Sequence, residues 1–167
     1  MTPSLTIRPA ASCDHDALWA MLEPVFRAGD TYAIEPDIGR AAALAYWTAA
    51  PGRAFLAEAE RPLGTFYLRP NARGGGAHVA NAGFVTAPSA RGRGVARAML
   101  RRAEAEARKA GFLAMQFNFV VATNESALHI WRTEGYALVG RLPRAFRHPS
   151  EGRVDAFVMF KSLEGPA

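Results

Sequence analysis

The chain has 167 residues and a net charge of +5, and 50% of its residues are hydrophobic. A chain of this length buries enough apolar surface to fold without disulfides or metals, so we expect one domain over residues 1–167. The single cysteine, Cys13, excludes an intrachain disulfide, and the four histidines lack the spacing of metal ligands. No metal site is therefore predicted.

The apolar runs are short and interrupted by charged residues or glycine. None of them approaches the roughly 20 residues that a membrane helix needs. Residues 1–9 contain Arg8 and lack the apolar region of a signal peptide. These features predict a cytoplasmic protein with no membrane partner.

Hydrophobic periodicity in the first half predicts two helices and three strands. Apolar residues at helical spacing from Leu18 to Val25 indicate the first helix, with Ser12 as its cap. Pro36 near the first turn of the second helix and Pro51 beyond its end are typical boundary signals. The predicted elements are a strand at 5–8, helices at 14–26 and 36–49, and strands at 54–58 and 63–68.

The second half alternates strands and helices. Gly111 and Gly135 stand where helices commonly end, and Asn124 precedes the last helix as an N-cap. The nearly continuous apolar run at 114–121 indicates a strand that is covered on both faces and has a parallel neighbour. The predicted elements are strands at 78–86, 114–121, 136–142 and 154–160, and helices at 92–110 and 125–133. This order indicates an α/β (α+β) domain built on a mixed sheet.

A glycine-containing connection joins the strand that ends at Thr86 to the helix that follows it. Gly92 and Gly94 leave backbone N–H groups unobstructed, and the start of the helix adds its positive dipole end. Such an arrangement is typical of a pyrophosphate cradle. The P-loop motif GxxxxGK is absent, and the dinucleotide motif GxGxxG lacks its third glycine because Arg97 stands there.

Arg91 to Ala96 reads Arg-x-x-Gly-x-Ala, and it resembles the signature by which GCN5-related N-acetyltransferases (GNAT) bind the CoA pyrophosphate. Residues 124–136, which begin 33 residues after Arg91, resemble a second motif of that family, and residues 7–9 and 154–159 extend the resemblance. It implies a mostly antiparallel sheet of about seven strands with about four helices, splayed between the fourth and fifth strands. It also implies an enzyme that transfers an acetyl group from acetyl-CoA to an amine.

The resemblance assigns the cofactor contacts to three segments. The backbone of Phe84, Val85 and Thr86 would pair with the pantetheine arm, which fills the splayed gap like an extra strand. Asn124 would bond the pantetheine from the last helix. The pyrophosphate would lie on Arg91, Gly92, Arg93, Gly94, Val95 and Ala96. Acetyl-CoA is thus the expected cosubstrate, with no metal, and a homodimer is a possible assembly because dimers are common in the family.

Two features depart from the family pattern. Trp131 stands where many members carry a tyrosine that protonates the departing CoA sulfur, and an indole cannot serve as that acid. The segments 77–86 and 114–121 contain no carboxylate that could act as the base. Their two amides, Asn81 and Asn118, are either structural or catalytic. In the catalytic interpretation they orient the amine or its neighbouring carboxylate and stabilise the tetrahedral intermediate.

A narrower resemblance concerns the acceptor. Residues 78–84 and 147–156 are similar to the branch of the family that acetylates proline analogues such as azetidine-2-carboxylate. This likeness implies a small-molecule amine, an amino acid or a proline analogue, as the substrate. The candidate pocket residues are Tyr32, Tyr67 and Arg69, each of which could equally be an ordinary core or surface residue. The alternative acceptor is the amine of a protein or peptide.

Two other classes of function stay open. Residues 91–109 carry seven Arg or Lys side chains, which would suit a nucleic-acid-binding module. Two glutamates interrupt that run and no recognition-helix or zinc motif is present, so nucleic acid is not an expected partner. Three of the arginines are expected to form a solvated face paired with those glutamates: Arg97, Arg101 and Arg102 with Glu104 and Glu106. The missing acid and base leave a non-catalytic acyl-CoA binder as the second alternative.

Overall fold

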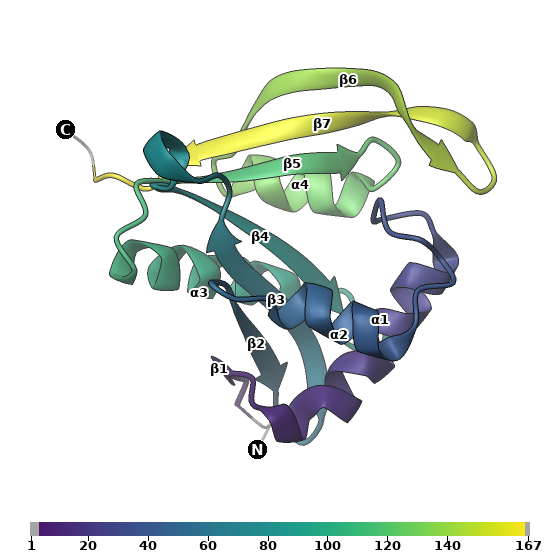
Figure 1. Ribbon diagram of the computed structural model, residues 1–167, viewed down its shortest axis with the longest axis vertical. Helices are drawn as coiled ribbons and strands as arrows, with labels where there is room; N and C mark the ends of the chain where they lie inside the picture. The colour runs from purple at the N-terminus through teal and green to yellow at the C-terminus, as the bar shows by residue number, and fades with distance from the viewer. Residues whose placement is uncertain (1–3, 166–167) are drawn as a thin grey trace.

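The computed structural model describes residues 4–165, so residues 1–3 and 166–167 of the predicted domain lie outside it. Within 4–165 seven strands form one sheet, in the order β1-β2-β3-β4-β5-β7-β6, and four α-helices flank it (Figure 1). The strands are β1 (Thr6–Pro9), β2 (Arg53–Glu58), β3 (Pro62–Pro70), β4 (Val79–Thr86), β5 (Ala114–Val121), β6 (Ala137–His148) and β7 (Gly152–Ser162). The helices are α1 (His15–Ala28), α2 (Arg40–Thr48), α3 (Val95–Lys109) and α4 (Glu125–Thr133). The predicted α/β class with a mixed sheet is confirmed.

Neighbouring strands of the sheet run antiparallel, with one exception. β4 and β5 run parallel, and they pair only near their starts, through Val79 with Ala114 and Ala80 with Met115. Beyond these pairs no further register joins the two strands, so the splay expected between the fourth and fifth strands is present. The middle of the sheet is therefore open along the second half of β4.

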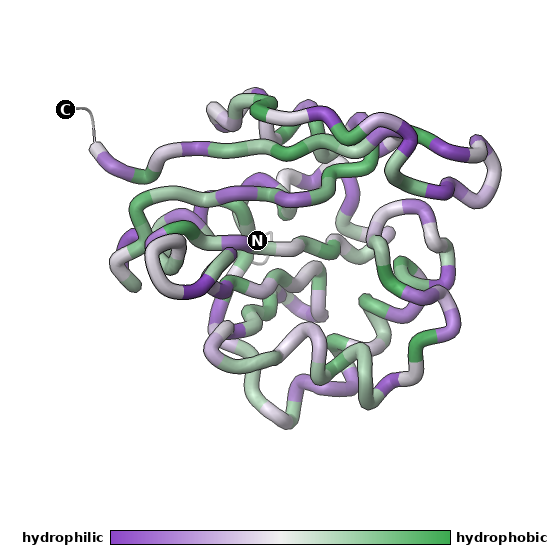
Figure 2. Tube along the Cα trace, turned by 45° about the horizontal axis from the view of Figure 1, so that its top comes forward, coloured by the Kyte–Doolittle hydropathy of each residue, from purple (hydrophilic) through white to green (hydrophobic). Residues whose placement is uncertain are grey.

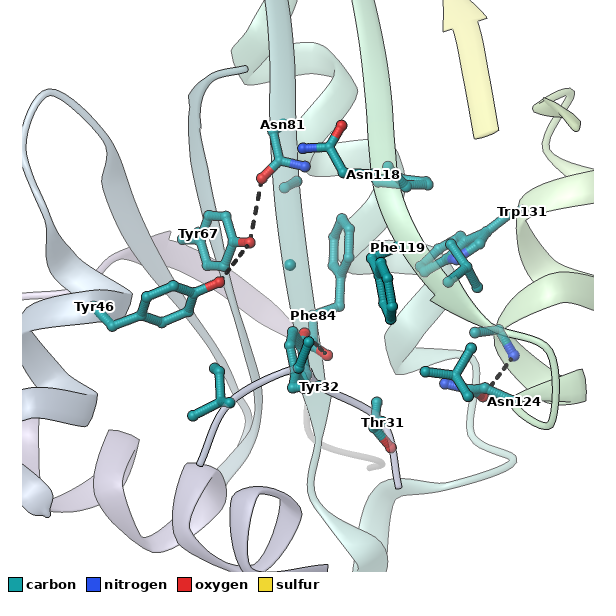
Figure 3. Close-up of a pocket in the computed structure, with 18 of the residues that line it drawn as sticks. Thr31, Tyr32, Tyr46, Tyr67, Asn81, Phe84, Asn118, Phe119, Asn124 and Trp131 are labelled. Atoms are coloured by element: carbon teal, nitrogen blue, oxygen red, sulfur yellow. Dashed lines mark hydrogen bonds between the residues drawn. The ribbon is translucent and has the colours of Figure 1, made fainter. Parts of the chain in front are cut away.

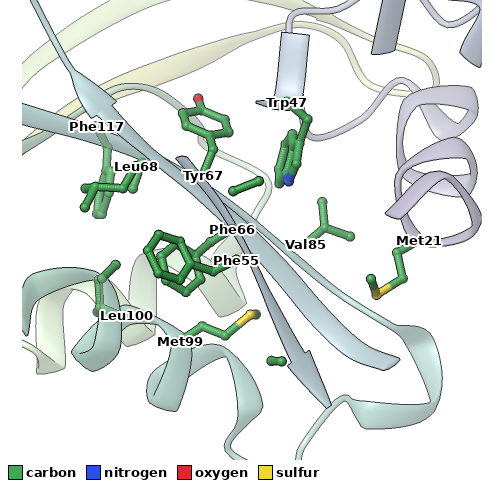
Figure 4. Packing of buried hydrophobic residues seen from close by; sticks show 14 of the residues in the cluster. Met21, Trp47, Phe55, Phe66, Tyr67, Leu68, Val85, Met99, Leu100 and Phe117 are labelled. Atoms are coloured by element: carbon green, nitrogen blue, oxygen red, sulfur yellow. The ribbon is translucent and has the colours of Figure 1, made fainter. Parts of the chain in front are cut away.

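Helices cover both faces of the sheet. α3 packs against β3 and β4 on one face, whereas α1 and α2 contact each other and cover the opposite face (Figure 1). On the α3 side, the rings of Phe55 and Phe66 stack with centroids 4.6 Å apart (Figure 4). Burying each ring stabilises the fold by about 2–3 kcal/mol. A Cβ at Gly64 would lie 2.7 Å from the Cε atom of Met99, so the missing side chain lets α3 approach the sheet.

The structure corrects the predicted starts of two helices. α2 begins at Arg40 and not at Pro36, because residues 35–38 form a hydrogen-bonded turn. α3 begins after Gly94 and not at Gly92, because these glycines adopt left-handed φ values of 76° and 72°. In contrast, β5 and α4 have the predicted bounds, and Asn124 caps α4 by accepting a hydrogen bond from the amide of Ala127.

The last two strands are longer than predicted. β6 and β7 form a hairpin that projects beyond the other strands (Figure 1), and His148 is the last residue of β6 and not part of a loop. The hydrophobic stretches of the chain are short and are separated by hydrophilic ones (Figure 2). Among residues 4–165, no helix combines the length and the apolar character that crossing a membrane requires.

The arginines of α3 find partners that differ in part from the prediction. Arg102 pairs with Glu106 at 2.9 Å, as expected. Arg97 and Arg101 instead pair with Glu134 at 2.9 and 3.0 Å. Glu134 is the C-cap residue that follows α4. These arginines pair with it because α3 and the end of α4 come together in the fold, which spacing within one helix cannot indicate.

The structure also corrects the predicted cap of the first helix. Ser12 lies in a single 3-10 turn before α1, and the first helix residue is His15. The Asp14 carboxylate accepts hydrogen bonds from the amide of Ala11 at 2.7 Å and from two guanidinium nitrogens of Arg8 at 2.8 and 2.9 Å. These donors favour the ionised carboxylate and lower the pKa of Asp14 to about 2. Because the pKa is depressed in the folded state, this stabilisation is present above pH 4 and is lost as the pH falls toward 2.

We expect Asp14→Asn to lower the free energy of unfolding by about 1–2 kcal/mol at pH 7, and by less as the pH approaches 2. The matched control is Asp16→Asn, because the Asp16 side chain is 91% exposed and that of Asp14 is 9% exposed. Denaturant unfolding at pH 7 and near pH 3 measures both variants. Equal losses in the two variants would contradict the assigned role of Asp14.

Candidate functional site

A groove of about 780 Å³ runs past the end of β4 and the starts of α3 and α4. Of the cofactor contacts expected from the sequence, Arg93 alone does not line it. The predicted contacts that do line it are Phe84, Val85, Thr86, Arg91, Gly92, Gly94, Val95, Ala96 and Asn124. The fold therefore brings the strand end, the glycine turn and the cap of α4 to one surface.

The glycine turn has the chemistry of an anion site. Neither Gly92 nor Gly94 has an atom within 4 Å of the place where a Cβ would stand, so their backbone is open on that side. The first-turn N–H groups of α3 have no partner within the helix and carry the positive end of its dipole. Arg91 adds a positive side chain to the same groove, and Arg97, which also pairs with Glu134, lines it as well. A ligand with a pyrophosphate would meet donors and positive charge here.

A smaller cavity of about 230 Å³ adjoins the groove (Figure 3). It contains the three predicted substrate residues, Tyr32, Tyr67 and Arg69, together with both predicted amides, Asn81 and Asn118. Groove and cavity share one wall, which consists of Thr31, Phe84, Asn124, Ala127 and Trp131. An arm that follows β4 along the groove would thus end at the cavity.

Asn81 lies where the pairing of β4 with β5 ends. It is buried, its Nδ2 donates to the carbonyl of Gln116 at 3.0 Å, and its Oδ1 accepts from the hydroxyl of Tyr67 at 3.2 Å. The amide thus adds one side-chain bond across the strands just beyond the last backbone pair, Ala80 with Met115. Both of its polar atoms have protein partners, which favours the structural interpretation of Asn81.

Asn118 differs from Asn81 in exposure and partners. The apolar run at 114–121 predicts a strand that is covered on both faces, but Asn118 is exposed on the cavity side of β5. Its Oδ1 accepts from Nε2 of Gln116 at 2.8 Å, and its Nδ2 donates to Oδ1 of Asn71 at 2.6 Å. These two bonds fix the plane of the carboxamide. The carboxamide nitrogen of Asn118 carries two hydrogens, so one N–H remains for a ligand.

Three tyrosines surround the cavity. The hydroxyl of Tyr32 donates to the carbonyl of Phe84 at 2.8 Å, and the hydroxyls of Tyr46 and Tyr67 lie 3.5 Å apart. A Cβ at Gly83 would lie 2.5 Å from the Tyr67 ring, so glycine is what lets this ring lie across β4. Burial raises the pKa of Tyr32 and of Tyr67 well above the usual value, so both hydroxyls stay protonated at neutral pH.

Trp131 forms the shared wall by packing. It is buried, and its ring lies 5.2 Å from that of Phe84 and 4.9 Å from that of Phe117, centroid to centroid. No Asp, Glu, Lys or His is among the described residues that line the small cavity. Positioning and hydrogen bonding are therefore the means by which this cavity can act on a bound amine.

The sequence analysis did not predict several residues of the site. Asn71 and Tyr46 belong to other parts of the chain and join the site only through the fold. His148 and Glu151 bring the turn between β6 and β7 to the groove. In the part of the chain that the structure describes, no three His, Cys, Asp or Glu side chains are grouped as metal ligands would be.

Comparisons with known proteins agree with this geometry. The model of the acetyltransferase (GNAT) family matches residues 16–136. N-acetyltransferase aca1 of Schizosaccharomyces pombe is 36% identical over 106 residues, which are 61% of this chain and 51% of that protein. The chain thus spans about half the length of this curated relative.

Two solved structures share the fold. A GCN5-related N-acetyltransferase from Kribbella flavida is 37% identical, with a TM-score of 0.90 over 95% of this chain and 97% of that chain. A phosphinothricin acetyltransferase from Sinorhizobium meliloti, in complex with AcCoA, is 19% identical, with a TM-score of 0.82 over 98% of this chain and 93% of that chain. The family match over most of the chain and the splayed sheet lead to one conclusion: the chain belongs to the acetyltransferase (GNAT) family.

Proposed function

We propose that the protein transfers the acetyl group of acetyl-CoA to the amine of a small molecule. The observation that carries this proposal is the wall shared by the long groove and the small cavity, at Phe84 and Trp131 among others. A thioester at the end of the groove would face an amine in the cavity. Holding the two reactants in this way turns a bimolecular reaction into an effectively unimolecular one.

The cofactor is proposed to follow β4. Its pyrophosphate would lie on the turn at 91–96, where N–H groups and positive side chains gather. Its pantetheine amides would pair with the backbone edge of β4 at 84–86, as an added strand does; the carbonyl of Phe84 accepts from Tyr32 and has a second lone pair for the ligand. Asn124 uses its Oδ1 to cap α4, so its Nδ2 is available to a pantetheine carbonyl. The missing half of the β4–β5 pairing is thereby replaced by the ligand.

The chemical step needs no dedicated acid. The neutral amine attacks the thioester carbonyl, the C–N bond forms, and the oxygen becomes an oxyanion that the free N–H of Asn118 is proposed to stabilise. The C–S bond then breaks, the CoA thiolate leaves toward the positive end of α4, and the amine proton passes to water. The products are the acetamide and CoA, with the thiolate protonated by solvent.

The size of the cavity favours a small acceptor over a protein or peptide. It holds about 230 Å³, and the loop between α1 and α2 lines it with Thr31 to Ile34. Ion pairs also reduce the attraction of the basic α3 run for nucleic acid, since Arg101 pairs with Glu134 and Arg108 with Glu104. The cytoplasmic location and the homodimer stay predictions from the sequence.

A screen of amines with acetyl-CoA, read by release of free thiol, tests the function. The panel contains small amino acids, simple amines, polyamines and peptides with free N-termini. Turnover with small amines supports the proposal. Turnover with peptides alone would favour the protein acceptor, and tight CoA binding without any turnover would favour the non-catalytic binder.

We expect Gly94→Asp to abolish measurable CoA binding, because it adds a negative carboxylate to the groove and strains a backbone φ of 76°. The control is Gly111→Asp, at a φ of 86° with the same open space but away from the groove. Calorimetric titration with CoA compares both variants with the parent. Parent-like CoA affinity in the Gly94 variant would show that the pyrophosphate lies elsewhere.

We expect Asn118→Ala to lower kcat by about 10²-fold, the scale seen when one preorganised donor to an oxyanion is removed. The melting temperature and the CoA affinity should change little, because Asn118 is exposed and does not line the groove. Asn81→Ala provides the contrast, with a lower melting temperature because it breaks the bond to β5. Normal turnover in Asn118→Ala would remove Asn118 from the mechanism.

A further inference from the structure

Arg69 occupies an unusual position near the end of β3. It is half-buried and lines the small cavity beside Tyr46, Tyr67 and Asn81. The guanidinium carbon lies 4.1 Å from the ring centroid of Tyr67 and 4.8 Å from that of Tyr46. The cation is thus held against two aromatic rings, and Figure 3 shows both tyrosines turned toward the amide of Asn81.

No carboxylate neutralises this cation. Among residues 4–165, Arg69 forms no ion pair, and every other arginine without an ion pair is exposed. Arg69 is also the one charged side chain among the described residues that line the cavity. A partly desolvated charge without a counterion is costly, so an anion is the natural ligand of this position.

The hydrogen bonds of Arg69 leave part of the guanidinium free. Nη2 donates to the hydroxyl of Tyr46 at 3.1 Å, and Nη1 approaches the Tyr46 carbonyl at 3.5 Å. A guanidinium has five N–H donors in a planar fork, so donors remain for a ligand. Such a fork matches the two oxygens of a carboxylate.

A chain of polar contacts fixes this cation relative to the splay of the sheet. From Arg69 it passes through the hydroxyls of Tyr46 and Tyr67 to Asn81, whose Nδ2 reaches the carbonyl of Gln116 on β5. The same residues that hold Arg69 therefore lead to the point where β4 and β5 part. A ligand on Arg69 would have a defined position relative to a thioester in that gap.

We propose that Arg69 is an anion subsite that binds the carboxylate of the acceptor, so that the substrate is a small amino or imino acid. This inference rests on the proposed function and adds the residue that selects the acceptor. A cavity of about 230 Å³ requires the carboxylate and the reacting amine to lie a few bonds apart. Polyamines and peptide N-termini are poor substrates, because they would bring positive charge, or no nearby carboxylate, to Arg69.

The test uses two acids, azetidine-2-carboxylate and L-proline, each with its carboxamide, which keeps the amine and removes the negative charge. The parent should acetylate the acids with a kcat/KM about 10²-fold above that of the carboxamides. Arg69→Gln should abolish this preference, mainly by raising the KM of the acids. Arg69→Lys should restore it in part, since an ammonium keeps the charge and loses the fork.

The matched control is Arg73→Gln, because Arg73 is exposed, forms no ion pair among the described residues and does not line the cavity. It should behave as the parent does. Melting temperature and CoA affinity, measured on each variant, separate loss of folding from loss of the subsite. An unchanged preference for acids in folded Arg69→Gln, or equal use of acids and carboxamides by the parent, would overturn the inference.

A direct binding measurement distinguishes failure of this subsite from failure of the proposed function. Azetidine-2-carboxylate is titrated into the protein saturated with CoA, where no transfer occurs. Binding by the parent and not by Arg69→Gln would support the anion subsite even if no amine were acetylated. Turnover of neutral amines with no binding of the acid would retain the acetyltransferase and reject the subsite.

Discussion

The site depends on the early end of the parallel pairing between β4 and β5. Two adjacent strands that stop pairing leave backbone N–H and C=O groups without partners, which is costly away from water. Side chains satisfy some of these backbone groups with hydrogen bonds. The amide of Asn81 bonds the β5 backbone just past the last pair, and the hydroxyl of Tyr32 bonds the carbonyl of Phe84 further along β4. What remains open is suited to a ligand with amides of its own.

Packing on both faces keeps the strands apart. On one face, the rings of Phe84, Phe117 and Trp131 pack against one another and fill the space below the gap. On the other, the Tyr67 ring lies across β4 at Gly83, where any side chain would collide with it. Because protein interiors are close-packed, these two layers resist closure of the gap. Trp131 stands where the family pattern has a tyrosine. It therefore contributes packing to this wall and has no hydroxyl that could donate a proton.

Local signals predicted the parts of the fold that local interactions decide. β5 and α4 were predictable to the residue because an apolar run, an asparagine cap and Gly135 mark their limits within a few positions. The start of α2 was not predictable, because Pro36 is compatible with a helix. The turn at 35–38 is held instead by Arg27, whose guanidinium donates to the carbonyls of Pro36 and Ile38. Similarly, the spacing of the α3 arginines could not indicate Glu134, which directly follows α4.

In the candidate site, too, residues in contiguous motifs were predictable and residues that meet only through the fold were not. The glycine turn and the residues 84–86 follow from contiguous motifs, so the sequence places them in one segment. The environment of Asn118 could not be predicted from a local motif, because its hydrogen-bond partner Asn71 is 47 residues away and lies beyond the end of β3. Tyr46 likewise reaches Arg69 from α2, and nothing in the residues around either one indicates the contact. Whether Asn81 or Asn118 keeps an N–H for a ligand depends on hydrogen bonds to residues that are distant in the sequence.

Electrostatics links the two halves of the site. The groove gathers helix amides and arginines for a multiply charged cofactor, while the cavity contains a single cation among uncharged groups. Tyr32 and Tyr67 have raised pKa values, so neither supplies a base near neutral pH, and no carboxylate lines the cavity. The positive Arg69 also disfavours a bound ammonium, whose loss of a proton is the first requirement of attack. A cavity of this composition therefore assists the reaction by favouring the neutral amine and by holding it near the gap, without a side chain that takes the proton itself.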